Sequence, residues 1–390
     1  MKTPNVPPVP HPPQSSQPPQ APVAYWEYLQ LPTLLDIQGG VSRDEKDLSQ
    51  DEVVFIAVHQ VYELWLKLML RDLVSARDLF AAPHVPDDAM SGASRLLARI
   101  RTILELGADH FRLVESITPR DFLNFRDNLF PASGGQSVQF REIEILFGLE
   151  EHERIPYITQ GTYQDVLHEA DGSEGWAMAR VKARIADTPT LKNAIDEWLH
   201  RTPINGSKPD DAGDREVVHA FVEEYLGRHE TAVQEMVDRA CAMVHGEDTR
   251  NALRRRYGAE LEGAGEFLRA LDVPEGAARE RRQRIRAAAL FIEIYRELPL
   301  LAWPREVVDG LVAVEQAYVV FRQRHARMVE RIIGRRVGTG GSKGVDFLDE
   351  GARRYRIFKD LWAARTILVR RDLLPGPTDP DYYGFHFDEA

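Results

Sequence analysis

Residues 51–68 of the chain read DEVVFIAVHQVYELWLKL, and the spacing of the apolar side chains in this stretch decides the fold class. The apolar positions recur at steps of three and four residues, which is the period of a helix with a wide buried face. They are Val54, Phe55, Val58, Val61, Tyr62, Leu64, Trp65 and Leu68. The pattern predicts a long helix over about residues 51–80, with His59 on its apolar face.

Helical periodicity returns along most of the remaining chain. Further helices are expected at 92–116, 138–148, 174–200, 214–245, 249–271, 276–297, 305–333 and 352–368. Alternating strand patterns are nearly absent, and Gly, Pro, Asn and Ser punctuate the breaks between the periodic stretches. The sequence therefore predicts an all-α fold, a helical bundle.

Composition and periodicity divide the chain into five parts. Residues 1–23 hold nine prolines, and we expect a disordered tail there because proline lacks the N–H that helices and sheets need. A helical part is expected at 24–150 and an inserted helical subdomain at 151–300. Residues 301–375 carry a last long helix and a glycine-rich loop, and 376–390 form a C-terminal tail.

The composition is that of a globular protein and argues against binding to nucleic acid. Hydrophobic residues make up 43% of the 390 residues, which is enough for a sizeable core. The formal charge of −12 is spread through stretches of mixed sign, and no block of Lys and Arg is flanked by aromatic residues. We therefore expect no nucleic-acid partner.

Cysteine usage and hydropathy indicate the compartment. Cys241 is the only cysteine, so the chain has no internal disulfide, zinc ribbon or dithiol redox motif. No uninterrupted apolar run reaches the ~18 residues that span a bilayer, and the N-terminus has no apolar signal core. We expect a cytoplasmic protein with no membrane segment.

Three polar side chains lie on apolar helix faces. For His59, a hydrogen-bonded core residue is the commoner role and a functional residue the rarer one. For His325, the commoner role is that of a partly exposed histidine among arginines, and the other is an axial haem ligand with the neighbouring arginines available to the propionates. Arg126 follows a helix start at Thr118 and has apolar neighbours such as Phe122. A guanidinium there needs an anion, because an unpaired buried charge is costly. The anion is either a structural carboxylate or a substrate carboxylate.

Two glycine-rich turns are candidate ligand contacts. Residues 131–137 read PASGGQS and lead into a helix, so their backbone N–H groups and the Ser133 hydroxyl are available to a ligand. Residues 338–342 read GTGGS. This second turn lacks the Lys-Ser/Thr ending and the preceding strand of a phosphate loop, which argues against nucleotide binding. Most turns of either kind have no ligand.

Four motifs, in this order along the chain, resemble the tryptophan 2,3-dioxygenase family. They are YWEYLQL at 25–31, FIAVHQVYELWLK at 55–67, DFLNFRD at 121–127 running into PASGGQSVQFR at 131–141, and RHARMV at 324–329 followed by GTGGS at 338–342. The resemblance covers about residues 25–375. It favours functional roles for the two histidines and the arginine.

The resemblance implies a haem-dependent oxygenase that acts on tryptophan or a tryptophan derivative. His325 would be the proximal iron ligand of a b-type haem, and His59 would hydrogen-bond the indole N–H as the catalytic residue. Arg126 would hold the substrate carboxylate, and Thr339 would contact the substrate ammonium and carboxylate groups. The alternative of a haem sensor or carrier would not need Arg126 and Thr339 together.

The resemblance also implies a pocket and an assembly. Phe55 and Phe122 would line the indole pocket, with Ser133 close to the distal face of the haem. The assembly would be a homotetramer, built as a dimer of dimers, in which an N-terminal segment reaches into a neighbouring subunit's pocket. The residues of that segment are Tyr25, Tyr28 and Leu29.

The reaction implied is cleavage of the indole C2–C3 bond of L-tryptophan by O₂, which gives N-formylkynurenine. The alternative is a haem-dependent monooxygenase that acts on the indole ring of a substituted tryptophan. Both reactions need the same haem and the same grip on the substrate carboxylate.

Two positions depart from the family's pattern. Gly135 stands where an aromatic residue is usual. The missing side chain would enlarge the pocket, and the empty space would favour a bulkier substrate or tolerate water. Lys343 stands where a serine is usual. Its ammonium would alter contacts to a haem propionate or to the substrate carboxylate, unless the side chain faces solvent.

Overall fold

The computed structural model describes residues 23–130, 132–156, 161–169, 171–338 and 342–384, without the side chains of Asp87 and Asp88. Every regular element in these ranges is an α-helix or a short 3₁₀ helix, and no strand occurs within them. The prediction of an all-α fold is therefore confirmed. The chain divides into two compact units, residues 1–57 and residues 58–390. The domain boundaries predicted from the sequence stay predictions.

The described part of the first unit ends in the long helix α3 (Gln50–Ala81), which continues into the second unit. α3 begins where the hydroxyl of Ser49 accepts the backbone N–H of Glu52 at 3.2 Å, and its bounds confirm the helix predicted over 51–80. An 18-residue window of α3 has a mean hydropathy of 1.5, so its length and composition alone would suffice to cross a membrane. The short elements before it are α1 (Tyr25–Tyr28), α2 (Leu31–Leu34) and η1 (Glu45–Asp47).

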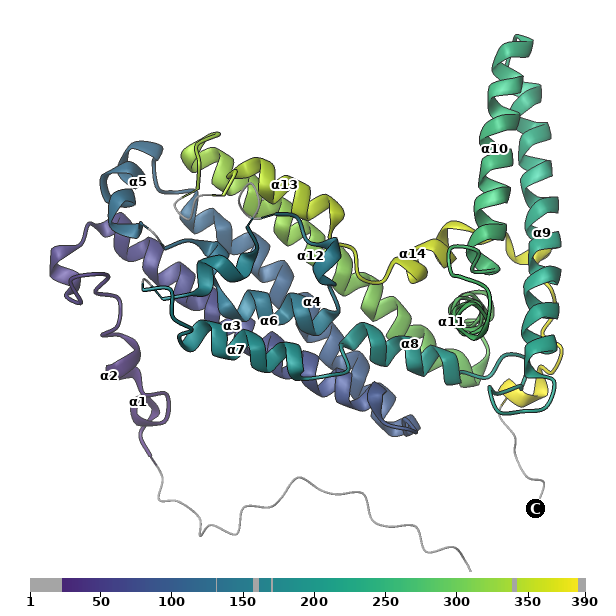
Figure 1. The fold of residues 1–390 in the computed structure, drawn as a ribbon, viewed down its shortest axis with the longest axis horizontal. Helices are drawn as coiled ribbons and strands as arrows, with labels where there is room; N and C mark the ends of the chain where they lie inside the picture. The colour runs from purple at the N-terminus through teal and green to yellow at the C-terminus, as the bar shows by residue number, and fades with distance from the viewer. Residues whose placement is uncertain (1–22, 131, 157–160, 170, 339–341, 385–390) are drawn as a thin grey trace, which may run out of the picture. The chain divides into compact units, whose positions relative to one another are not determined.

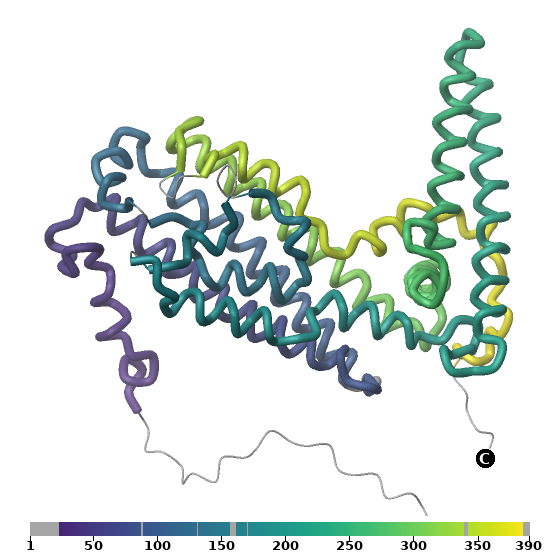
Figure 2. The backbone as a smooth tube through the Cα atoms, in the orientation of Figure 1, coloured from purple at the N-terminus to yellow at the C-terminus, as the bar shows by residue number. Residues whose placement is uncertain are grey.

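Three helices that pack together form the centre of the second unit. Figures 1 and 2 show them side by side: α4 (Asp87–Val114), α12 (Ala302–Ile333) and α13 (Val345–Arg354). Glycine permits the close approach of α4 to α12, because a Cβ at Gly107 would lie only 3.0 Å from the ring of Phe321. The approach brings α4 against the turn of α12 that carries His325.

Hydroxyl side chains cap the two helices that flank the first glycine-rich turn. α5 (Pro119–Arg126) follows Thr118, whose hydroxyl accepts a backbone N–H of the first helical turn at 3.2 Å. α6 (Val138–Phe147) follows Ser137, whose hydroxyl does the same at 3.3 Å. Short 3₁₀ turns lie between and after them: η2 (Asp127–Leu129), η3 (Gly134–Gln136), η4 (Glu151–Glu153) and η5 (Tyr163–Leu167).

The single helix predicted over 174–200 is wrong. The chain forms two helices there, α7 (Trp176–Ala186) and α8 (Leu191–Arg201). Pro189 lies between them, and it ends the helical pattern because it has no N–H to donate to a preceding turn. Apolar residues recur at helical steps both before and after this break, which explains why the pattern suggested one helix.

The single helix predicted over 352–368 is also wrong, because α13 ends at Arg354 and α14 (Lys359–Thr366) follows separately. The buried carboxylate of Glu315 on α12 holds the chain in a turn between them. It accepts the backbone N–H of Phe358 at 3.0 Å and also the N–H of Ile357. These two backbone N–H groups thus donate to a distant side chain and not to the carbonyls of a preceding helical turn.

The remaining helices match their predictions within a few residues. α9 (Asp214–Met243) and α10 (Glu247–Leu268) form the hairpin at the right of Figure 1, and α11 (Ala277–Ile294) packs against both. The C-terminal segment packs against the rest of the second unit as far as Tyr383, whose buried hydroxyl donates to the carbonyl of Pro203 at 3.0 Å. The last short turns are η6 (Pro299–Leu301), η7 (Arg371–Leu373) and η8 (Asp381–Tyr383).

Candidate active site

The second unit contains five of the residues predicted for the site. His59 lies on α3, Phe122 and Arg126 lie on α5, Ser133 precedes η3, and His325 lies on α12. Thr339 lies outside the described residues, and the first unit carries the others, Phe55, Tyr25, Tyr28 and Leu29. A cleft of about 560 Å³ between α8 and α11 contains none of these residues.

His325 lies in the bundle interior but keeps part of its surface accessible. Its ring stacks on Phe111 of α4, with 5.3 Å between ring centroids and 18° between the planes. Burial lowers the pKa of His325 to about 4, with smaller contributions from the charges of His59 and Arg322. The imidazole is therefore neutral at pH 7, and the two predicted histidines lie close enough to influence each other electrostatically.

An aromatic cluster joins the helices around the two histidines. Tyr62, one turn from His59, packs against Phe111 at 5.1 Å and against Phe321 at 6.0 Å between ring centroids. Its hydroxyl donates to the carbonyl of Gly107 at 2.7 Å, and burial raises the pKa of Tyr62 well above its usual value. Tyr62 is thus a neutral structural link between α3, α4 and α12.

The arginines next to His325 are already paired with carboxylates. Arg324 donates to both oxygens of Glu115, at 2.6 and 2.8 Å. Arg322 pairs with Glu144 and also donates to the hydroxyl of Tyr318 at 2.8 Å. These pairs fix α12 against α4 and α6, so the cations that flank His325 in the sequence have structural partners.

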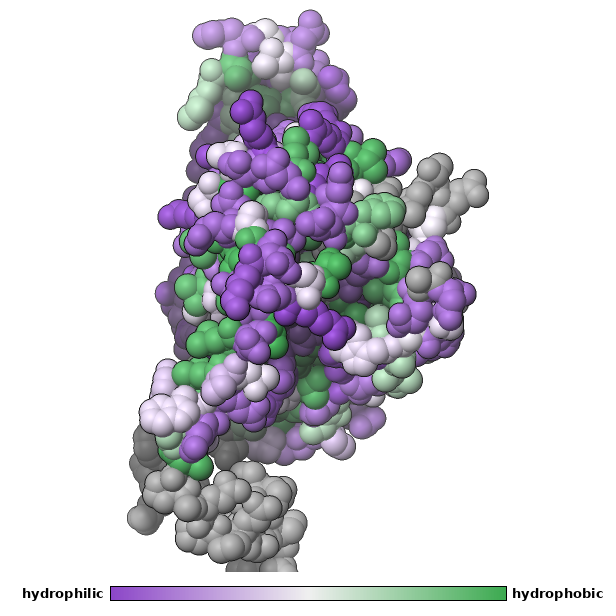
Figure 3. All heavy atoms as spheres, turned by 90° about the vertical axis from the view of Figure 1, so that its left-hand side faces the viewer, coloured by the Kyte–Doolittle hydropathy of each residue, from purple (hydrophilic) through white to green (hydrophobic). Residues whose placement is uncertain are grey.

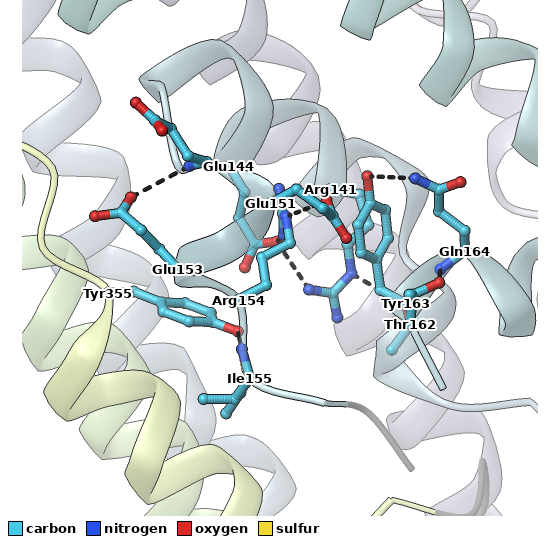
Figure 4. Close-up of polar contacts among 12 residues, drawn as sticks. Arg141, Glu144, Glu151, Glu153, Arg154, Ile155, Thr162, Tyr163, Gln164 and Tyr355 are labelled. Atoms are coloured by element: carbon cyan, nitrogen blue, oxygen red, sulfur yellow. Dashed lines mark hydrogen bonds and ion pairs between the residues drawn. The ribbon is translucent and has the colours of Figure 1, made fainter. Parts of the chain in front are cut away.

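Glu144 is the centre of a buried charge cluster beside α12, part of which is shown in Figure 4. Its side chain is fully buried and accepts hydrogen bonds from Arg141 at 2.8 Å, from Arg154 at 2.7 Å and from Arg322. Burial alone would raise the pKa of Glu144, but the three guanidiniums together hold it well below its usual range. The cluster carries more positive than negative charge, and Arg154 also lies over the Tyr163 ring at 4.4 Å.

Arg126 is partly buried at the end of α5 and is oriented by a backbone contact. Its Nη2 donates to the carbonyl of Val337 at 2.7 Å, next to the second glycine-rich turn. Its Nε is buried and has no hydrogen-bond partner. Within the described residues of the single chain, a backbone carbonyl orients this guanidinium, and no ion pair with a described carboxylate is present.

Phe122 adds an apolar wall to the same helix. Its ring is 7% exposed and packs edge-on against Phe125, with 5.2 Å between centroids. The guanidinium of Arg126 thus lies on a helix whose neighbouring side chains are buried aromatics. Such surroundings strengthen a charge-assisted contact with an anion, because the local dielectric is low.

The turn that carries Ser133 is held at both ends. The N–H of Ser133 donates to the side-chain oxygen of Gln136 at 3.1 Å, and the side-chain amide of Gln136 donates to the carbonyl of Val166 at 3.0 Å. The hydroxyl of Ser137 donates to Glu63 on α3 at 2.6 Å. Reasoning from the sequence missed Glu63, although its place one turn after His59 was a signal that it would lie near the site.

The chain matches a family model described as tryptophan 2,3-dioxygenase over residues 14–368. The chain belongs to this family. A tryptophan 2,3-dioxygenase of Sorangium cellulosum is 49% identical over 94% of this chain and 88% of its own length. Tryptophan 2,3-dioxygenase 2 of Ralstonia nicotianae is 46% identical over 93% of this chain and 98% of its own. Tryptophan 2,3-dioxygenase B of Danio rerio is 34% identical over 94% and 86%.

The two departures from the tryptophan 2,3-dioxygenase pattern differ in their surroundings. Lys343 is exposed, so its ammonium faces solvent. Gly135 is partly buried, and its carbonyl accepts Nε of Arg141 at 3.3 Å. Of the two positions, only Gly135 belongs to a turn fixed by contacts with several neighbouring elements.

Proposed function

We propose that the chain is a haem-dependent tryptophan 2,3-dioxygenase that cleaves the C2–C3 bond of L-tryptophan to give N-formylkynurenine. The observation that carries this proposal is the family match over nearly the whole chain, together with a neutral, interior His325 near His59. The relatives compared above are named for this dioxygenation, which favours it over the monooxygenase alternative.

The donor set around His325 fits a haem b. The described residues contain no group of three or more His, Cys, Asp or Glu side chains able to hold a bare metal ion. A porphyrin supplies four nitrogens itself and needs one axial ligand from the protein. A neutral imidazole in the bundle interior is such a ligand, because one of its ring nitrogens carries a lone pair. When bound, the haem iron supplies the binding and activation of O₂.

The protein side chains would bind and orient the substrate. Arg126 would hold the carboxylate through its remaining N–H groups, since one is already used by Val337. His59 would accept the indole N–H and so fix the orientation of the indole ring. Thr339 would contact the ammonium and carboxylate groups. Holding both ends of the amino acid places C2 and C3 in one orientation.

The indole pocket would be completed by apolar walls and one hydroxyl. Phe122 is buried beside Arg126 on α5, where it would cover one side of the ring. Phe55, one turn before His59 on α3, would cover another, and Ser133 would lie near the distal face. Walls of this kind exclude water from the reacting atoms.

We propose a homotetramer, built as a dimer of dimers. In the single chain the N-terminal apolar side chains are exposed: Tyr25 at 70%, Tyr28 at 77% and Leu29 at 41%. Of the apolar 18-residue stretch within α3, only 22% is buried inside the chain. Exposed apolar side chains of this kind are typical of a subunit interface. On the face that Figure 3 presents, hydrophobic residues lie interspersed with hydrophilic ones. A cytoplasmic location, which suits the free Cys241, is part of the proposal.

Isotope labelling tests the reaction. The haem-loaded, reduced protein is incubated with L-tryptophan under ¹⁸O₂, and the product is analysed by mass spectrometry. We expect a ring-opened product that contains both labelled atoms. A bicyclic product with a single labelled atom would contradict dioxygenation and would support the monooxygenase alternative.

A further inference from the structure

Glu63 connects α3 to the start of α6 through three hydrogen bonds. Its carboxylate accepts the hydroxyl of Ser137 at 2.6 Å and the side-chain amide of Gln139 at 2.8 Å, and its backbone carbonyl accepts the same amide at 2.7 Å. Hydrogen bonds to a charged acceptor are stronger than those between neutral groups. The start of α6 is therefore fixed to the turn of α3 that follows His59.

Ser137 transmits this contact into the turn that carries Ser133. Its hydroxyl donates to Glu63 and at the same time accepts the N–H of Phe140, so it is both the link to α3 and the N-cap of α6. Gln136, the residue before it, holds the N–H of Ser133. The position of Ser133 relative to α3 is thus set by a short chain of hydrogen bonds that ends at Glu63.

The same contact has an effect on the His325 side. Phe140, in the first turn of α6, stacks on Tyr318 with 5.9 Å between centroids and 26° between planes, and its ring lies 6.2 Å from that of Phe321. Phe321 is one turn before His325 on α12. Moving the start of α6 would therefore also disturb its ring contacts with α12.

We propose that Glu63 is a positioning residue for tryptophan binding, which holds the 133–137 turn in register with the helical turn of α3 that carries His59. The inference rests on the proposed function and deepens it. Glu63 itself does not touch the substrate. It acts through Ser137 and Gln139, and its removal would loosen the wall that carries Ser133 without removing any group that binds the carboxylate or the iron.

The test compares Glu63→Ala, Glu63→Gln, Ser137→Ala and the Glu63→Ala/Ser137→Ala double variant in the full-length, haem-loaded protein. We expect Glu63→Ala to raise the KM for L-tryptophan by roughly tenfold, the scale for losing one charge-assisted hydrogen bond, while kcat changes little. Glu63→Gln keeps an oxygen acceptor for Ser137 and should give an intermediate rise. The double variant should raise the KM by less than the product of the two single effects, because both changes break the hydrogen bond between Glu63 and Ser137, although Ser137→Ala also removes the N-cap of α6.

A second readout does not depend on turnover. The dissociation constant of cyanide from the ferric protein reports the distal side of the haem, and we expect it to shift in Glu63→Ala while haem content per subunit is unchanged. The matched control is Asp72→Ala, because Asp72 is a buried carboxylate on the same helix that accepts Nε of Arg99 at 2.6 Å. It should lower the thermal unfolding midpoint and leave KM and cyanide binding unchanged.

The outcomes separate this inference from the function on which it rests. Unchanged KM and cyanide affinity in the Glu63 variants, in a parent protein that oxidises tryptophan, would overturn the positioning role alone. An equal rise in KM for Asp72→Ala, or additive effects in the double variant, would overturn it too. A parent protein that neither binds haem nor oxidises tryptophan would overturn the proposed function, and this inference with it. If Glu63→Ala fails to fold, Glu63→Gln and Ser137→Ala give the same comparison.

Discussion

The rings of Phe111 on α4 and His325 on α12 lie nearly parallel, with 18° between their planes and 5.3 Å between their centroids. Phe111 is only 4% exposed, so its ring is a fixed wall on one face of the imidazole. An imidazole already held in one plane loses little freedom when a ring nitrogen binds a ligand. The stacking thus preorganises His325 for the role proposed for it.

Truncating Phe111 should therefore weaken both the fold and the hold on haem. We expect Phe111→Ala to lower the free energy of unfolding by about 3–5 kcal/mol, the usual cost of deleting a buried aromatic ring. Phe111→Leu fills most of the space and should cost less. Urea unfolding of the haem-free protein measures the first effect, and transfer of haem to apomyoglobin measures the second. Equal haem loss from the alanine variant and the parent would rule out the preorganising role.

Arg126→Gln should reduce kcat/KM for L-tryptophan by a factor that corresponds to about 2–5 kcal/mol, the scale for removing one member of a desolvated charge pair. The parent should use tryptamine poorly, because tryptamine lacks the carboxylate. The control is Arg120→Gln, an exposed arginine on the same helix, which should leave kcat/KM unchanged. Equal turnover of tryptamine and tryptophan by the parent would give Arg126 a structural role instead.

The buried Glu144 should make the free energy of unfolding depend on pH in the acidic range. Its pKa in the folded protein lies below the value of 4.5 expected in the unfolded chain. The stabilisation is therefore complete at neutral pH and is lost as the pH falls below about 4.5, since the unfolded chain then binds the proton first. We expect Glu144→Gln to lower the free energy of unfolding at pH 7 by about 3–5 kcal/mol, and this difference should shrink toward pH 3. A difference that stays constant from pH 7 to pH 3 would contradict the assignment.

Gly135→Phe should narrow the range of substrates. A glycine in the turn that carries Ser133 leaves room at the indole end, while the grip of Arg126 on the carboxylate is unaffected. We expect the parent to accept tryptophans methylated on the ring or at Cβ, and Gly135→Phe to favour unsubstituted tryptophan. Competition assays with mixed substrates measure the ratio of kcat/KM values. Strict selectivity for tryptophan in both proteins would show that this position has no bearing on substrate choice.

Local pattern predicted the elements of the fold but not all of their ends. The apolar spacing gave α3 and α12 correctly, and it placed His59 and His325 on helices. It did not separate α13 from α14, because the turn between them depends on Glu315 more than forty residues earlier. An acceptor that comes from a distant helix leaves no periodic signal in the segment that it ends.

For the site, too, the sequence identified single residues but not the contacts between distant segments. In the sequence, residue type and local context singled out Arg126. In the structure its buried Nε has no hydrogen-bond partner, which fits a guanidinium that binds an anionic ligand. The sequence could not show that Arg324 pairs with Glu115, or that Glu63 accepts a hydrogen bond from Ser137, because each pair joins segments far apart in the chain. Such pairings depend on how α3, α4, α6 and α12 pack against one another.

Haem binding by His325→Ala tests the proposed cofactor site most directly. The variant and the parent are titrated with haemin, and the Soret absorption and the haem content per subunit are measured with and without added imidazole. Because His325 is neutral and interior, we expect the parent to bind one haem per subunit, the variant to lose stable binding, and free imidazole to restore part of the Soret band. A variant with the parent's Soret spectrum and stoichiometry in the absence of imidazole would contradict His325 as the ligand.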